Sequence, residues 1–124
     1  MLPNGTFYLG NESAGAMETR AFLRRNQRPN YATQSGPMLV IRNRIHPLFK
    51  PSSSFKKRRN AVGVSRDGRR VYFVISENSV IFYSLAKFFL NKLRTPNALY
   101  LDGGHVPQMV TNKFSISSFS PVGP

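Results

Sequence analysis

Two of the five acidic residues in this 124-residue chain follow apolar, strand-like runs. Asp102 comes directly after residues 98–101 (ALYL) and is followed by two glycines, and Glu77 comes two residues after residues 71–75 (VYFVI). A carboxylate at a strand end, beside glycines that let a ligand approach the backbone, is one way in which a sheet presents a functional group. Paired carboxylates suit general acid and base catalysis on a glycosidic-type bond. An Asx-type turn at the end of a strand explains Asp102 about as well.

The segments around these acids predict how the two are positioned. The Asp-Gly pair at residues 67–68 separates two apolar runs and predicts a β-hairpin over residues 61–75 with a type I′ turn. Residues 80–93 carry an apolar stripe of helical period. A strand, a helix and a second strand form a βαβ crossover, in which two parallel neighbours end at the same edge of a sheet. We therefore expect Glu77 and Asp102 to lie together at that edge.

The whole pattern predicts an α/β fold (α+β, with a mixed sheet). We expect a single domain with a central mixed β-sheet, a β-hairpin, and a βαβ crossover packed by one long helix. Upstream of the hairpin, the pattern predicts strands over residues 6–9, 31–34 and 38–41, a polar loop over residues 10–15, and a helix over residues 17–25.

The composition limits the kinds of ligand and cofactor that the chain could bind. Eighteen Lys and Arg against five Asp and Glu give a formal net charge of +13, which predicts attraction to nucleic acid, acidic lipid or phosphorylated ligands. The absence of cysteine excludes disulfides, Cys-ligated zinc and thiol catalysis. With only two histidines, a His-based metal site is not expected. No apolar run is as long as a membrane span, and the first residues do not resemble a signal peptide, so the localisation stays undetermined.

Two further polar segments are expected to converge on the edge that holds the acids. Gln34, Ser35 and Gly36 interrupt a strand with an amide, a hydroxyl and a glycine, and Arg59 and Asn60 enter the hairpin. A guanidinium suits a phosphate group through two parallel charge-assisted hydrogen bonds. An arginine–carboxylate pair that only holds loops together explains the same residues about as well.

Three blocks of the sequence resemble the phosphodiester glycosidase family, which includes the lysosomal uncovering enzyme and many bacterial domains once of unknown function. These blocks are residues 31–40 (YATQSGPMLV), 59–64 (RNAVGV) and 98–104 (ALYLDGG), and their order and spacing match the family. Ser76-Glu77, before the expected helix, fits as well. The similarity covers about residues 4–104.

The resemblance implies an α/β domain that hydrolyses a sugar-1-phosphate diester and releases the sugar from a phosphorylated acceptor. Asp102 and Glu77 would then supply acid/base or metal-ligand chemistry, Arg59 would hold the phosphate, and Gln34 would orient the substrate. A divalent cation fits as a cofactor, since carboxylates beside a phosphate suit hard ions, but the sequence requires none. The remaining residues of the expected substrate-binding set are Ser35, Gly36, Asn60, Gly103 and Gly104.

The sequence also differs from the family pattern in two places. His105 follows the two glycines where the family usually has small or hydroxyl residues, and the family's Asn-Gly or Asn-Ala-Gly block, usually found well upstream of the strand at Phe7, is not part of this sequence. Two interpretations therefore stay open: one complete phosphodiester-glycosidase-like domain over residues 1–124, or a domain that is incomplete at both ends and inactive. The resemblance further implies relatives that are often exported or lysosomal.

Two functions of other classes also stay open. The cations of residues 56–59, with aromatic residues such as Tyr31 and Phe55, are compatible with a basic nucleic-acid-binding module. A non-catalytic carbohydrate or cell-envelope binder could use the same fold, because fold does not determine function.

Overall fold

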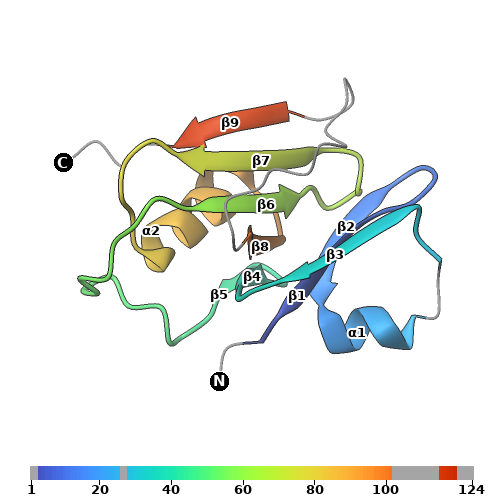
Figure 1. Cartoon of the computed structure of the whole chain (residues 1–124), viewed down its shortest axis with the longest axis horizontal. Helices are drawn as coiled ribbons and strands as arrows, with labels where there is room; N and C mark the ends of the chain where they lie inside the picture. Colours follow the sequence, from blue (N-terminus) through green and yellow to red (C-terminus); the bar gives the residue numbers. More distant parts are fainter. Residues whose placement is uncertain (1–2, 26–27, 102–114, 120–124) are drawn as a thin grey trace.

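The computed structural model describes residues 3–25 and 28–101, together with the backbone of residues 115–119. Two β-sheets pack against each other in this structure, and each has a short helix on its outer face (Figure 1). The smaller sheet has the strand order β2-β1-β3 and the larger one the order β5-β4-β8-β6-β7-β9. All pairings are antiparallel except that of β7 with β9, which is parallel.

The elements have the following bounds. The small sheet consists of β1 (Gly5–Leu9), β2 (Ala14–Glu18) and β3 (Tyr31–Ser35). The large sheet consists of β4 (Met38–Ile41), β5 (Arg44–Ile45), β6 (Asn60–Val64), β7 (Val71–Ser76), β8 (Asn97–Leu101) and β9 (Ser115–Phe119). The helices are α1 (Thr19–Arg24) and α2 (Phe82–Lys87), and α2 continues as a π-helical stretch, η1 (Phe88–Leu93).

The expectation of an α/β fold with one long packing helix is wrong. The described residues form mainly β-sheet, and α-helix is limited to two segments of six residues, α1 and α2. The expected helix over residues 80–93 is α-helical only in α2 and then changes to the i→i+5 bonds of η1. An apolar stripe indicates which side of a helix is buried, but it does not distinguish the α from the π hydrogen-bond pattern.

The expected crossover between neighbouring parallel strands is also wrong. β7 and β8 run in the same direction, but β6 lies between them and is antiparallel to both. The hairpin explains this order, because it pairs one side of β6 with β7 and leaves the other side of β6 free to pair with β8. Asn60 lies opposite Ile75 on one side and Leu101 on the other, so β7 and β8 still end at one edge of the sheet.

The two faces of the large sheet bury different partners. One face packs against the small sheet, with the rings of Phe7 and Phe73 in an edge contact at 5.6 Å between centroids. The other face packs against α2 and η1, and Leu85 and Phe89 are fully buried there. Alternation along β6 therefore directs Val62 to the small sheet, and it directs Ala61, together with Arg59 two residues earlier, to the α2 side.

Candidate functional site

One edge of the large sheet brings the sequence blocks of interest together, and we call it the site edge. It is formed where β4 and β6 begin and where β7 and β8 end. The carbonyl of Pro37 accepts a hydrogen bond from the backbone N–H of Tyr100 (3.1 Å), and the carbonyl of Arg59 accepts one from the N–H of Ser76 (2.9 Å). Glu77 directly follows β7, and Leu101 is the last described residue before Asp102. Segments far apart in the sequence thus meet here.

Arg59 is the buried cation of the site edge, with only 3% of its surface exposed. Its Nε donates to the carbonyl of Val80 (2.8 Å) and its Nη2 donates to the carbonyl of Phe55 (3.2 Å). The guanidinium carbon lies 3.7 Å from the ring centroid of Phe82 and 5.5 Å from that of Tyr100. Such contacts of a desolvated guanidinium with aromatic faces are attractive. The side chain therefore ties the segment before β6 to the start of α2.

The electrostatics of Arg59 favour an anion nearby. Desolvation lowers the pKa of the guanidinium, and interactions with Tyr100 oppose this shift, while no carboxylate of the described residues contributes to it. Arginine has five N–H donors, and the two backbone carbonyls use the Nε donor and one Nη2 donor. The Nε–Nη2 side of the guanidinium is thus already used by two backbone carbonyls, and the guanidinium also has a side-chain hydrogen bond with Tyr100.

The backbone around Arg59 is held in place on two sides. The N–H of Arg59 donates to the Oγ of Ser76 (2.7 Å), and Ser76 is 2% exposed. Lys57 and Val80 exchange two backbone hydrogen bonds, at 3.2 and 2.9 Å. Ser76 is a positioning residue: the sequence singled it out only as the neighbour of Glu77, and a serine at a strand end carries no signal for such a role.

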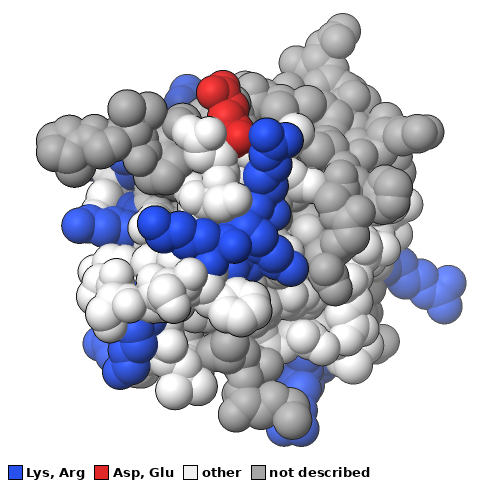
Figure 2. All heavy atoms as spheres, turned by 60° about the vertical axis from the view of Figure 1, so that its left-hand side comes forward, with Lys and Arg blue, Asp and Glu red and all other residues white. Residues whose placement is uncertain are grey.

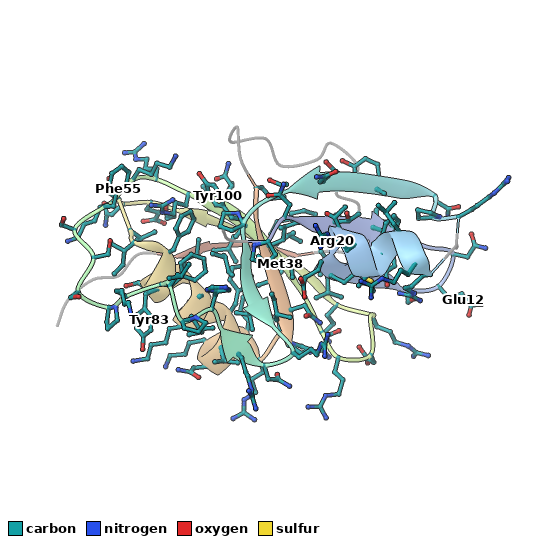
Figure 3. The ribbon with its side chains drawn as sticks, turned by 90° about the horizontal axis from the view of Figure 1, so that it is seen from below. Glu12, Arg20, Met38, Phe55, Tyr83 and Tyr100 are labelled. Atoms are coloured by element: carbon teal, nitrogen blue, oxygen red, sulfur yellow. The ribbon has the colours of Figure 1, made fainter. Side chains whose placement is uncertain are left out.

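A cavity of about 540 Å³ opens beside Arg59, a volume typical of small-molecule sites. In Figure 3, Phe55, Tyr83 and Tyr100 lie on the side of the molecule away from α1. The sequence did not predict this cavity, because an apolar stripe over residues 80–93 indicates a buried helix face and not a space beside it. Its lining combines apolar, aromatic, hydroxyl and cationic side chains: Leu48, Phe49, Lys50, Ser52, Ser53, Phe55, Arg59, Phe82 and Tyr83.

Gln34, Ser35 and Gly36 approach the site edge from the other face of the large sheet. Gln34 is exposed and lies opposite Thr6, so it shares the outer face of the small sheet, where Thr6 contacts Thr19 of α1 (3.0 Å). Ser35 lies opposite Gly5, on the inner face, and Gly36 follows β3. Gln34 is not among the residues that line the cavity beside Arg59.

The other expected site residues have different surroundings. Asn60 is half-buried at the first position of β6, and Glu77 is exposed. Asp102, Gly103 and Gly104 lie outside the described residues. The part of the chain that the structure describes contains no group of three His, Cys, Asp or Glu side chains that could hold a metal ion.

Comparison with known proteins supports the family resemblance found in the sequence. The family model described as phosphodiester glycosidase matches residues 2–123, nearly the whole chain. The chain belongs to the phosphodiester glycosidase family.

One curated relative is the uncharacterized protein YigE of Escherichia coli (strain K12), which is 36% identical over 101 residues. That alignment covers 82% of this chain but 39% of the relative, so the chain spans about two fifths of the relative's length. No solved structure matches the chain. Within the described residues, no helix has the length and apolar character that crossing a bilayer would require.

Proposed function

We propose that this domain hydrolyses the bond between a sugar and the phosphate of a sugar-1-phosphate diester. One observation supports the proposal: β6 begins and β7 and β8 end at the site edge, where a buried guanidinium without a carboxylate partner among the described residues lies beside a cavity. Membership of the phosphodiester glycosidase family supports the same class of reaction.

The proposed reaction breaks the bond between the anomeric carbon and its phosphate oxygen. Water adds to the anomeric carbon and gives up a proton, and the products are the free sugar and the phosphomonoester of the acceptor. The leaving phosphomonoester is a weak base, because the second pKa of such a group is about 6. Stabilisation of the charge on the leaving phosphate therefore matters more than its protonation. We assign this role to the fixed positive charge of Arg59, which acts in a site where aromatic rings exclude water.

The carboxylates have the complementary role. We propose that Asp102 and Glu77 take the proton from the attacking water or orient that water, as paired carboxylates do in glycoside hydrolysis. Ser35, Gly36, Asn60, Gly103 and Gly104 would contact the substrate, whereas Gln34, on the outer face of the small sheet, is given no contact with it.

The test uses a hexose-1-phosphate methyl ester, with the release of methyl phosphate followed by phosphorus NMR. We expect the purified chain to release methyl phosphate and free hexose. Asp102→Asn should lower kcat by roughly 10²–10⁴-fold. Asp67→Asn is the matched control and should leave kcat unchanged, since Asp67 lies in the hairpin turn at the opposite edge of the sheet. The proposal would be contradicted if the parent chain released no hexose and Asp102→Asn bound the methyl ester as tightly as the parent chain does.

A further inference from the structure

The segment between β5 and β6, residues 46–58, is cationic and acid-free. Lys50, Lys56, Lys57 and Arg58 are all exposed, and no Asp or Glu occurs between Glu18 and Asp67. Figure 2 views this end of the molecule from the left-hand side of Figure 1 and shows Lys and Arg side chains gathered at the centre of the face. The positive charge of the chain is thus concentrated partly where the cavity opens.

The same segment exposes two large apolar side chains. Leu48 is 57% exposed and Phe55 is 77% exposed, and both line the cavity beside Arg59. Water solvates such side chains poorly, so two of them at one rim indicate a partner with apolar character. The cations around them indicate that the partner is also anionic.

Hydrogen bonds to side chains of the same region hold the backbone that carries Leu48 and Phe55. The Phe55 carbonyl is bound by Nη2 of the buried Arg59 (3.2 Å), and the Phe55 N–H donates to the Oγ of Ser53 (3.2 Å). The Leu48 N–H donates to Nδ1 of His46 (3.1 Å), and the neighbouring Phe49 is buried. The backbone under the two exposed apolar side chains is therefore held by the fold.

We propose that residues 46–58 dock on the surface of an anionic lipid bilayer. Leu48 and Phe55 enter the interface between headgroups and acyl chains, while Lys50, Lys56, Lys57 and Arg58 contact lipid phosphates. A bilayer offers both partners at once, since exposed apolar residues together with cations are the combination that binds interfaces. A nucleic-acid strand would use the ring of Phe55 for stacking but would leave the aliphatic Leu48 without a partner. Docking in this orientation directs the cavity toward the headgroup layer.

The experiment is sedimentation of the full chain with vesicles of phosphatidylcholine, with and without roughly 30% phosphatidylglycerol. We expect binding only to the anionic vesicles, and weaker binding when about 0.5 M salt screens the charges. The variant Lys50→Gln/Lys56→Gln/Arg58→Gln should lower the partition coefficient about a hundredfold. The matched control, Arg66→Gln/Arg69→Gln/Arg70→Gln, removes three exposed cations from the hairpin at the other edge of the sheet and should have a much smaller effect.

A second pair of variants tests the apolar rim. Leu48→Ser/Phe55→Ser should lower the partition coefficient about tenfold, because interfacial burial of the two side chains is lost. Leu23→Ser changes a side chain that is 70% exposed on α1 and should leave binding unchanged. Circular dichroism verifies that each variant folds.

Three results would overturn the inference. The first is equal binding to neutral and anionic vesicles. The second is an equal loss of vesicle binding in the two triple-Gln variants. The third is binding to a single-stranded oligonucleotide that is tighter than binding to anionic vesicles and that Phe55→Ser abolishes. The last result would assign the surface to nucleic acid.

Discussion

The two ends of the β6–β7 hairpin hold polar groups in opposite ways. At the turn, Asp67 accepts hydrogen bonds from the Ser65 hydroxyl (2.7 Å) and the Arg69 N–H (3.0 Å), all within five residues, and it is exposed. At the site edge, Arg59 is buried and binds the carbonyls of Phe55 and Val80, the second of which lies 21 residues away. A local network stabilises a turn that faces solvent. A long-range network fixes a charge in the interior, where its electrostatic effect is larger.

The largest predicted effect is at Arg59. Arg59→Met should lower the free energy of unfolding by about 2–5 kcal/mol, because two carbonyls lose their donor and the contact with Phe82 weakens. The neighbouring Arg58→Met is the matched control, since Arg58 is exposed and should change stability by less than about 0.5 kcal/mol. Urea denaturation measures both. Equal effects of the two substitutions would remove the contrast between the two ends.

Substitution of Phe82, whose ring packs against the guanidinium, should have an intermediate effect on the free energy of unfolding. Phe82→Leu removes the ring that lies 3.7 Å from the guanidinium carbon and should cost about 1–2 kcal/mol. In a double-mutant cycle with Arg59→Met, the two costs should not add, because the residues are in direct contact. Strict additivity would show that the ring and the guanidinium do not interact energetically.

The smallest predicted effect is at Asp67 and depends on pH. Hydrogen bonds from Ser65 and Arg69 lower the pKa of the Asp67 carboxyl. A carboxyl whose pKa is lower in the folded state stabilises the fold above its unfolded pKa of about 3.9, and this contribution disappears as pH falls through the folded pKa. Asp67→Asn should therefore lower the urea midpoint slightly at pH 7 and leave it unchanged near pH 2. A loss of the same size at both pH values would show that the charge is not involved.

The contrast between the two ends also explains what the sequence could predict. The strands flanking residues 67–68 are a local signal, and β6 and β7 lie within a residue of the expected positions. The turn itself differs from the expectation. Only Gly68 has a positive φ there (75°), whereas the two positive φ values of a type I′ turn occur at Arg42 (48°) and Asn43 (67°).

Long-range features were less predictable. The expected polar loop over residues 10–15 ends in β2, whose small residues Ala14 and Ala16 are buried against the large sheet. These residues have weak β-propensity, and the strand forms because close packing of two sheets needs small side chains. The position of β8 beside β6, and the cavity beside Arg59, likewise depend on pairings between distant segments. β7 and β8 do end at one edge of the large sheet, but because both are antiparallel to β6 and not because they form the expected crossover.

The most direct test of the proposed reaction is the position of the bond that breaks. Hydrolysis of the hexose-1-phosphate methyl ester in ¹⁸O-labelled water can be followed by mass spectrometry of both products. We predict that the label enters the anomeric hydroxyl of the hexose and that methyl phosphate contains none. Label in methyl phosphate would show cleavage between phosphorus and oxygen, which would contradict a glycosidase mechanism at this site.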